Sequence, residues 1–294
     1  MKCIPKLSLV FLACVASTTA AAETTLEKVA RTGEITLSYR ESSAPFSYLD
    51  GNKPIGFSWD IANKVVDQVK QQLKKPDLKI KTMAVTSQNR IPLVQNGTVD
   101  LECGSTTNSK VRQQDVTFGI NHFYTSTKIL VRGDSGIKGY GDIKGKSIAA
   151  TTGTSNLLTM RRYSAEHKLD LNLVQVKDHS EAILLVENQR AAGFATDDVL
   201  LYSAKAMAKD PAMFEVVGDA LNPEPYGCML RKDDPEFKQL VNGVIKNLMA
   251  SGEFETLYNK WFLNPIPPMG KVINIPMSQE LRDNMTKLSD QPLS

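Results

Sequence analysis

The stretch KSIAATTGTSNLLTMRRYSAEHKLDLNLVQV, residues 146–176, contains the unit from which most of this sequence is built. KSIAAT is short and mostly apolar, as expected of a buried strand, and the segment from Ser155 to His167 has the length of a helix. LNLVQV then has the pattern of a second strand. Parallel strands need a crossover of a dozen or more residues, usually a helix. The stretch therefore predicts a strand, a helix and a parallel strand.

The same alternation of strands and helices occurs on both sides of this stretch. Further strands are expected at 34–39, 78–85, 99–102, 191–196, 213–218 and 226–231. Helices are expected at 26–31, 58–73, 88–95, 180–189, 198–209, 236–250 and 253–262. Ser58 is predicted to cap the second of these helices. The alternation predicts α/β sheets with parallel strands, and its restart after TKILVRG, residues 127–133, predicts two lobes.

The first 22 residues have the pattern of a secretory signal peptide. Lys2 and Lys6 precede the apolar run LSLVFLACVA, which is too short to span a bilayer, and the alanines at 20–22 supply the small residues of a cleavage site. A lipoprotein signal ending at Cys14 is the weaker alternative, because Phe11 stands where an aliphatic residue is usual. The sequence therefore predicts export, with the periplasm as the location of the mature protein.

The charges of the mature chain nearly balance. The sequence has 35 Lys and Arg against 32 Asp and Glu, and loss of Lys2 and Lys6 with the signal peptide leaves 33 against 32, a net charge near +1. This balance argues against nucleic acid or an anionic membrane surface as the partner. Beyond the signal peptide, no apolar run approaches the roughly 20 residues of a membrane helix.

Cysteine and histidine positions limit the chemistry further. Cys103 and Cys228 remain in the mature chain, and in an oxidising compartment they can pair; two buried thiols are the alternative. The histidines are too scattered for metal-ligand spacing, so no metal site is expected; they are His122, His167 and His179.

Motifs for catalysis or phosphate binding are incomplete. GDIKGKS, residues 141–147, has three residues between its first two glycines where a P-loop has four, and it precedes a strand, so we interpret it as a surface turn. No G-x-S-x-G nucleophile elbow occurs. We interpret Asp197 and Asp198 as a helix N-cap with one inward carboxylate rather than as a catalytic dyad. No catalytic residue and no cofactor are therefore expected.

Cationic and hydroxyl side chains follow several of the expected strands at their carboxyl ends. In open parallel sheets, ligands bind beyond these ends. TTGTSN, residues 151–156, also opens a helix, whose free N–H groups favour an anion. The residues at strand ends are Arg40, Ser87, Arg90, Ser105, Thr107, Arg112, Thr154, Ser155, His179 and Asp197. Their position after successive strands in both halves predicts a shared ligand site.

Long segments of the chain carry a family resemblance. They are YRESSAPFSYLDG, VTSQNRIPLVQNGTVDLECGSTTN, VRQQDVTF, KDHSEA, ATDDVLL, YGCMLRKDDPEFK and NKWFLNPIPP, in order along nearly the whole mature chain. In these segments the sequence resembles the periplasmic glutamate/aspartate-binding proteins of bacterial ABC importers, within the polar amino acid-binding family, solute-binding protein family 3. The resemblance implies a type II periplasmic-binding-protein clamshell, in which two hinge strands join two α/β lobes.

The resemblance also implies a domain organisation. The first lobe would comprise residues 23–124 and a return segment at 226–264, and the second lobe residues 125–225. Residues 265–294 would form a C-terminal extension that is strapped to the surface or partly mobile. Cys103 and Cys228 would then both lie on first-lobe strands, which favours the disulfide if their separation permits bonding geometry.

The resemblance assigns roles to the residues at strand ends. Arg112 would hold the α-carboxylate of an amino acid in a forked pair, with hydrogen bonds from Thr107, and Ser105 and Asp197 would bind its ammonium group. The side-chain pocket would contain Arg40, Ser87, Arg90 and His179. Thr154 and Ser155 stand where close relatives have a Thr pair.

The implied function is capture of L-glutamate or L-aspartate for an inner-membrane ABC permease, by a monomer without enzymatic activity. An acidic side chain would compensate the buried cations, which an amide would leave unpaired. The cations still exceed the acids, so a further acidic group is expected nearby, with Glu102 and Asp198 as candidates. The alternative function is a dehydratase-like periplasmic enzyme on the same scaffold, with His179 as its acid or base.

Overall fold

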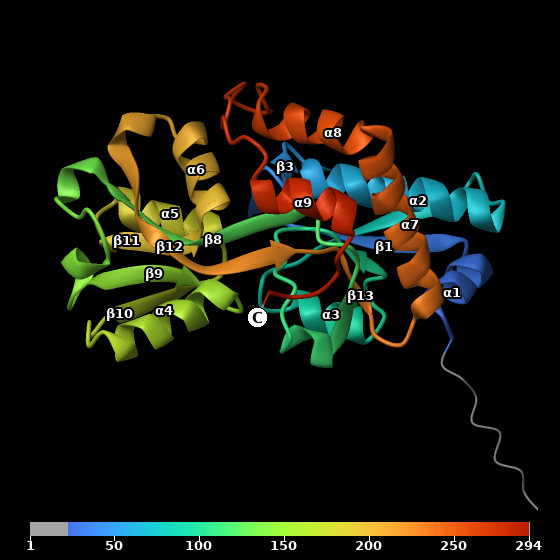
Figure 1. Cartoon of the computed structure of the whole chain (residues 1–294), viewed down its shortest axis with the longest axis horizontal. Coiled ribbons are helices and arrows are strands. Elements are labelled where there is room, and N and C mark those ends of the chain that lie inside the picture. Colours follow the sequence, from blue (N-terminus) through green and yellow to red (C-terminus); the bar gives the residue numbers. More distant parts are fainter. Residues whose placement is uncertain (1–22, 294) are drawn as a thin grey trace, which may run out of the picture.

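The computed structural model describes residues 23–293, so the predicted signal peptide at 1–22 lies outside the described residues. The chain forms two five-stranded sheets flanked by helices, and a small sheet of β2 (Ser42–Ser43), β3 (Ser47–Asp50) and β4 (Lys53–Ile55) (Figure 1). The first large sheet has the strand order β5-β1-β6-β13-β7, and the second β10-β9-β11-β8-β12. We call the parts built on these sheets lobe 1 and lobe 2. The predicted two-lobed α/β fold is confirmed.

Lobe 1 is centred on three parallel strands, β5 (Lys79–Ala84), β1 (Glu34–Tyr39) and β6 (Leu101–Glu102). β13 (Met229–Arg231) pairs antiparallel with β6 and with β7 (Val116–Phe118). The helices of this lobe are α1 (Thr25–Thr32), α2 (Phe57–Leu73), α3 (Arg90–Gln95), α7 (Pro235–Ser251) and α8 (Glu253–Phe262), with a short 3-10 helix, η1 (Arg112–Gln114).

Lobe 2 has the parallel strands β10 (Asn172–Val176), β9 (Ser147–Thr151) and β11 (Gly193–Asp197). β8 (Phe123–Arg132) pairs antiparallel with β11 and with β12 (Phe214–Tyr226). The helices are α4 (Ser155–Glu166), α5 (His179–Glu187) and α6 (Asp198–Met207), and the predicted turn at 141–147 overlaps the 3-10 helix η3 (Tyr140–Ile143). The predicted parallel strands form the centre of each large sheet, whereas β7, β8, β12 and β13 pair antiparallel. Two of these, β8 and β12, connect the lobes.

β8 and β12 run side by side from one lobe into the other (Figure 1). At the crossing, Tyr226 pairs with Phe123 and Glu224 with Thr125. The sequence pattern ended the second of these strands at Gly218, but β12 continues through Pro223 to Tyr226 with two irregularities in register. Pairing with β8 therefore extends the strand through a segment whose prolines favour a loop.

An aromatic cluster in lobe 1 holds the start of β8 and the end of β12. The Phe46 ring lies 4.8 Å from Phe123, 5.1 Å from Tyr226 and 5.6 Å from Phe262, centroid to centroid and edge to face. Such contacts add about 0.5–1.5 kcal/mol per pair beyond the burial of apolar area. The lobe 1 end of the crossing is thus firmly packed.

Helix α2 begins differently from the prediction. Ser58 is not its cap: Gly56, at a φ of 135°, occupies that position without a side-chain bond, and the helix starts at Phe57. A Cβ on Gly56 would lie 2.3 Å from the Phe46 carbonyl oxygen, so the chain needs glycine there. The buried Ser58 hydroxyl instead donates to the Gly104 carbonyl oxygen at 3.1 Å. The capping preference of serine is overridden by this close approach.

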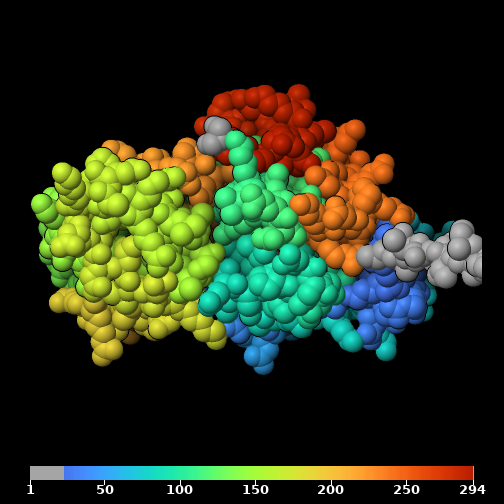
Figure 2. All heavy atoms as spheres, turned by 90° about the horizontal axis from the view of Figure 1, so that it is seen from below, coloured from blue at the N-terminus to red at the C-terminus, as the bar shows by residue number. Residues whose placement is uncertain are grey.

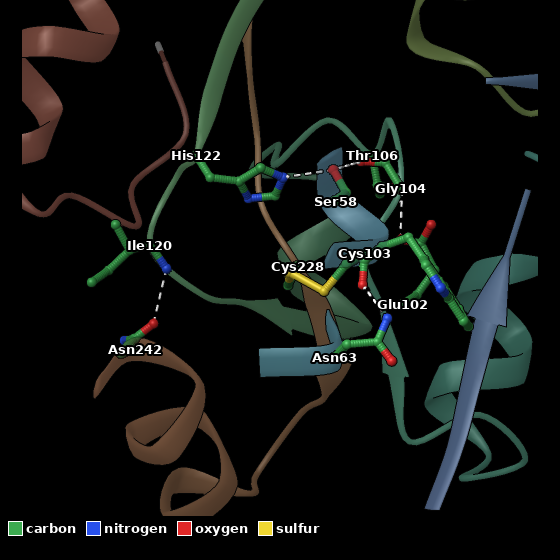
Figure 3. The surroundings of a disulfide bond; sticks show 11 residues. Ser58, Asn63, Glu102, Cys103, Gly104, Thr106, Ile120, His122, Cys228 and Asn242 are labelled. Carbon is green, nitrogen blue, oxygen red and sulfur yellow. Dashed lines mark hydrogen bonds between the residues drawn. A yellow bond between two sulfur atoms is a disulfide. The ribbon is translucent and has the colours of Figure 1, made fainter. Parts of the chain in front are cut away.

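Cys103 and Cys228 form a disulfide in the structure, with their Cα atoms 4.3 Å apart (Figure 3). The bond joins the segment that follows β6 to the segment between β12 and β13. Nearby, His122 Nε2 lies 3.2 Å from the Ser58 hydroxyl, and burial lowers the pKa of His122 to about 4. His122 is therefore a neutral, buried part of the lobe 1 framework.

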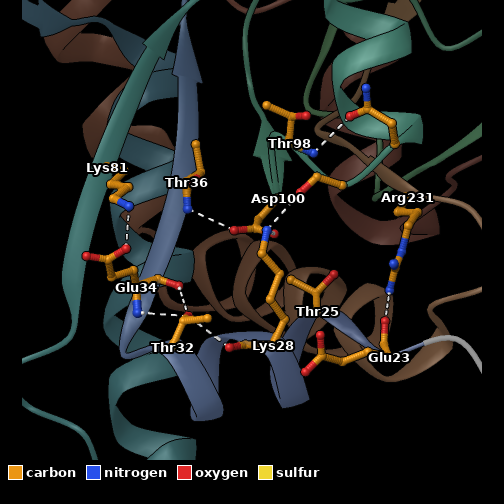
Figure 4. Close-up of polar contacts among 12 residues, drawn as sticks. Glu23, Thr25, Lys28, Thr32, Glu34, Thr36, Lys81, Thr98, Asp100 and Arg231 are labelled. Carbon is orange, nitrogen blue, oxygen red and sulfur yellow. Dashed lines mark hydrogen bonds and ion pairs between the residues drawn. The ribbon is translucent and has the colours of Figure 1, made fainter.

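Polar contacts tie α1 to the first sheet (Figure 4). The Lys28 ammonium donates to the Asp100 carboxylate at 2.8 Å, and the same carboxylate accepts from the Thr36 backbone N–H at 2.8 Å. The helix begins with a capping box between Thr24 and Glu27. These contacts fix the N-terminal helix against strands β1 and β6.

The C-terminal segment after α8 packs onto lobe 1 beside the crossing strands (Figure 1). Its helix α9 (Gln279–Lys287) buries Leu281 and Asn284. The Asn121 N–H donates to the Ser289 carbonyl oxygen at 2.9 Å, and the Asn108 amide donates to the Asp290 carbonyl oxygen at 2.7 Å. Of the two expectations for this extension, strapped or mobile, the structure therefore gives the strapped one.

Candidate functional site

The residues predicted from strand ends gather between the lobes. Lobe 1 contributes side chains that follow β1, β5 and β6, and lobe 2 contributes side chains that follow β9, β10 and β11. All are buried except Ser155, which is half-buried. The lobe 1 residues are Arg40, Ser87, Arg90, Ser105, Thr107 and Arg112, and the lobe 2 residues are Thr154, Ser155, His179 and Asp197.

The two lobes touch at this site. Arg112 donates across the interface to the Gly153 carbonyl oxygen at 3.2 Å, and Thr107 Oγ1 lies 3.2 Å from Ser155 Oγ. Gly153 packs so closely that a Cβ there would be 2.6 Å from Gln88 Cα. Figure 2 shows the yellow-green atoms of lobe 2 against the teal atoms of lobe 1. The structure is therefore a closed arrangement of the lobes.

Several guanidinium groups are held by lobe 1 itself. Arg40 Nη2 donates to the Ser87 hydroxyl at 3.0 Å, and Arg112 Nη1 donates to the Thr107 carbonyl oxygen at 2.8 Å. Arg90 Nη1 donates to the Ser105 carbonyl oxygen and to Thr106 Oγ1. These bonds orient the cations but use only part of their five donors.

Polar atoms remain without a hydrogen-bond partner among residues 23–293. In this site they are Arg40 Nη1, Arg90 Nε and Ser105 Oγ. A buried polar atom left unpaired costs about 1–3 kcal/mol, and more if it is charged. Within this range, two guanidinium donors and a hydroxyl of the site therefore remain free to bind an anionic, hydrogen-bonding ligand.

The charges of the site shift one another's pKa values. Burial, and then repulsion from Arg90, lower the pKa of Arg40 to about 9 and that of Arg112 to about 10. Burial and repulsion from Glu224 raise the pKa of Asp197 to about 7. Burial and the neighbouring Arg40 and Arg90 hold the pKa of His179 well below 6.5. The cations would thus gain from a bound carboxylate, and His179 stays neutral at pH 7.

His179 and Thr154 are engaged in lobe 2. His179 is the first residue of α5, and its Nδ1 lies 2.8 Å from Thr151 Oγ1. The Thr154 hydroxyl donates to the Thr151 carbonyl oxygen at 2.7 Å and accepts the Leu157 N–H as the cap of α4. Thr154 thus shapes the turn of TTGTSN, while its hydroxyl proton is already used.

Of the two candidates for a further acidic group near the site cations, only Glu102 is linked to one of them. Glu102 accepts from Thr106 at 2.6 Å, and Thr106 accepts in turn from Arg90, so Glu102 supports that guanidinium. Asp198 instead accepts from the hydroxyls of Thr125 and Ser126 on β8. Asp197 occupies the N-cap position of α6 but makes no capping bond, so it is the inward carboxylate of the pair.

Sequence reasoning missed one residue, Glu224 on β12. Its side chain is buried, and its Oε2 accepts from Thr107 Oγ1 and from Ser155 Oγ, each at 2.6 Å. A signal was present, because an acidic residue two positions before YGCMLR lies next to an expected strand. The flanking Pro223 and Pro225 made the segment look like a loop.

Metal and membrane features are absent from the described part of the chain. Among residues 23–293, no group of His, Cys, Asp and Glu side chains is arranged to hold a metal ion. None of the helices within the same range is long and apolar enough to cross a membrane.

Comparisons with known proteins place the chain in a family. Residues 35–264 match the model for bacterial extracellular solute-binding proteins, family 3. The chain is 45% identical over 269 residues to the L-glutamate/L-aspartate-binding protein of Pseudomonas aeruginosa, covering 91% of this chain and 89% of that protein. It is 44% identical over 273 residues to the glutamate/aspartate import solute-binding protein of Escherichia coli, covering 92% and 89%.

Solved structures agree on the fold. A mutant of ArgBP from T. maritima superposes with a TM-score of 0.72 at 24% sequence identity, covering 81% of this chain and 98% of that chain. This similarity concerns the fold alone.

Proposed function

Because this chain belongs to the bacterial extracellular solute-binding proteins of family 3, we propose that it captures L-glutamate or L-aspartate between its lobes. We further propose that it works as a monomer in the periplasm and delivers the amino acid to an inner-membrane ABC permease. The observation that carries the proposal is the buried site with three guanidinium groups, in which Arg40 Nη1, Arg90 Nε and Ser105 Oγ lack partners among the described residues.

The main-chain end of the ligand is assigned to the lobe interface. Arg112 is a forked donor that matches a carboxylate in two parallel hydrogen bonds. Asp197 is the inward carboxylate of lobe 2 and is suited to an ammonium group. Burial raises its pKa, and a bound cation would stabilise its ionised form.

The side-chain end of the ligand is assigned to Arg40, Ser87, Arg90 and His179. Burial and mutual repulsion already lower the pKa of Arg40. A carboxylate there supplies the missing acceptor and charge, whereas an amide would leave the cations uncompensated. This asymmetry predicts a preference for dicarboxylic amino acids.

The enzyme alternative on the same scaffold has less support. Its candidate acid or base, His179, stays neutral between the arginines, and its Nδ1 lies 2.8 Å from Thr151 Oγ1. The relatives reported above are binding proteins by name. Incubation with glutamate should leave the amino acid unchanged, and a new product would favour the enzyme.

Calorimetry with the mature protein tests the proposed function. We expect saturable 1:1 binding of L-glutamate and L-aspartate. Glutamine and asparagine should bind more weakly by tenfold or more, since one hydrogen bond to a charged group is worth about 1.5–3 kcal/mol. X-ray scattering should show compaction when glutamate is added, because the proposed contacts divide between the lobes. Absence of binding of either acidic amino acid contradicts the proposal.

Replacement of Arg90 by alanine tests the side-chain pocket. Arg90→Ala should weaken glutamate binding by about tenfold to a hundredfold, the value of one charge-assisted bond. It should also narrow the preference for glutamate over glutamine, because the unpaired cation that disfavours the amide is gone. Titration of glutamate and glutamine into wild type and into Arg90→Ala measures the ratio of the two affinities in each protein. The exposed Arg161 on α4 provides the control Arg161→Ala, which should bind like wild type.

An unchanged ratio would contradict the assignment. If Arg90→Ala weakens glutamate and glutamine by the same factor, Arg90 does not contact the ligand side chain. The preference for acidic ligands would then have to come from Arg40 or His179.

A further inference from the structure

Glu224 lies at the point where the two lobes and the crossing strands meet. It pairs with Thr125 in the register of β12 and β8, and it is 3% exposed. Its Oε2 accepts from Thr107 Oγ1 of lobe 1 and from Ser155 Oγ of lobe 2 at 2.6 Å each, and its Oε1 accepts from the Asn222 amide at 2.7 Å. One carboxylate thus binds one hydroxyl from each lobe.

The direction of these bonds determines what the hydroxyls can offer a ligand. A serine or threonine hydroxyl has a single proton and two lone pairs. An ionised carboxylate only accepts, so Thr107 and Ser155 both use their protons on Glu224. Their oxygens lie 3.2 Å apart with lone pairs left over. Two neighbouring acceptors of this kind suit an N–H donor, not a second carboxylate.

The charges around Glu224 agree with this direction. Its carboxylate is the second cause, after burial, of the raised pKa of Asp197, so two acids face the same region. Among the acids that offset the lowered pKa of Arg112, Glu224 is the first and Asp197 the second. An ammonium group beside Glu224 and Asp197 would separate the two negative charges.

We propose that Glu224 is a positioning residue of the ammonium subsite, which turns the Thr107 and Ser155 oxygens towards the amino group of the ligand as acceptors. This inference rests on the proposed function and refines it, since Thr107 was assigned to the α-carboxylate side. Because Ser155 belongs to lobe 2, the subsite is complete only when the lobes are closed. Recognition of the amino group and closure of the lobes are thereby linked.

The inference predicts how Glu224→Gln changes ligand preference. A glutamine amide lacks the negative charge, and its oxygen can accept from both hydroxyls only if its NH2 group faces the Asn222 amide, which is itself a donor. Turned the other way, the NH2 group donates to the hydroxyls, which then present their protons to the site. L-glutamate should bind about tenfold to a hundredfold more weakly. L-2-hydroxyglutarate, which keeps both carboxylates and replaces the ammonium by a hydroxyl, should change by less than about threefold. The ratio of the glutamate affinity to the 2-hydroxyglutarate affinity should therefore narrow by about threefold or more.

Displacement of radiolabelled glutamate at pH 8 measures both affinities, including weak ones. Glu215→Gln is the matched control, the same substitution on the same strand, where the side chain pairs with Lys138 at the surface. It should leave both affinities unchanged. Equal weakening of glutamate and 2-hydroxyglutarate in Glu224→Gln would show a merely structural role and overturn the inference.

Ser155→Ala tests the subsite without changing Glu224, and a double-mutant cycle with Glu224→Gln then tests whether the two residues act together. Ser155→Ala removes a half-buried hydroxyl at the start of α4 and should weaken glutamate by about threefold to tenfold. Glu224→Gln should cost less in the Ser155→Ala background than in wild type, because the residues act through one bond. If the losses of glutamate affinity in the two single variants add up to the loss in the double variant, the inference is overturned. If wild type binds no amino acid, the proposed function is overturned as well.

Discussion

Arg112→Ala should remove measurable binding of L-glutamate and L-aspartate alike. Arg112 is buried, and it donates both to Thr107 of its own lobe and to Gly153 of the other. Under the proposed function it also holds the α-carboxylate, which every amino acid ligand shares. Leaving a buried charge without its partner costs about 3–5 kcal/mol, or roughly two to four decades in affinity. Calorimetry with both ligands measures the loss.

Two further variants make the Arg112 result specific. Arg112→Lys keeps the charge but loses the planar fork, so it should bind more weakly than wild type and better than Arg112→Ala. Arg161→Ala removes an exposed arginine and should have no effect. Thermal unfolding checks that each variant is folded. If folded Arg112→Ala binds glutamate within about tenfold of wild type, Arg112 is not the carboxylate anchor.

Gly153→Ala should prevent full closure of the lobes and weaken glutamate by about a hundredfold or more, the equivalent of roughly 3 kcal/mol. A Cβ on Gly153 would lie 2.6 Å from Gln88 Cα and 2.8 Å from Ser87 C. These atoms belong to the backbone of lobe 1, so they cannot rotate away as a side chain would. X-ray scattering with saturating glutamate should then show less compaction than wild type.

Gly145→Ala separates backbone strain from the clash between lobes. Gly145 also lies in lobe 2 at a positive φ, 70° against 81° for Gly153, but a Cβ there meets nothing within 4 Å. Both substitutions should lower the unfolding temperature, because alanine is strained at positive φ. Only Gly153→Ala should lose affinity and compaction. Equal affinities of the two variants would show that the close approach at Gly153 is not needed for binding.

Closure of the lobes around a ligand also explains how the site can hold several buried arginines. The guanidiniums of Arg40 and Arg112 have pKa values lowered by burial and by Arg90. A bound anion offsets this repulsion only when the lobes surround it, since water screens exposed charges. Ligand contacts that exist in the closed form alone shift the equilibrium towards closure by their full free energy. Under the proposed function, the selectivity for acidic ligands and the closing of the lobes would therefore have a common electrostatic origin.

The fold class and most candidate site residues could be predicted from the sequence. Apolar runs of strand length that alternate with amphipathic helices produce parallel sheets, and the carboxyl ends of parallel strands share one edge. Arg40 after β1 and Arg90 after β5 are adjacent in the structure for this reason, because β1 and β5 pair in parallel. Local pattern and strand polarity were sufficient here, and no knowledge of distant contacts was required.

The tertiary structure alone decided which acid faces the site. Pro223 and Pro225 indicate a loop, yet pairing with β8 extends β12 through them and carries Glu224 into the interface. Its partners, Thr107 and Ser155, are 117 and 69 residues away in the sequence. The sequence by itself determined two α/β lobes with polar and charged side chains at their facing edges, because those features follow from local periodicity. The position of Glu224, and the turn of Asp198 towards β8, depend on contacts between distant segments that local propensity does not encode.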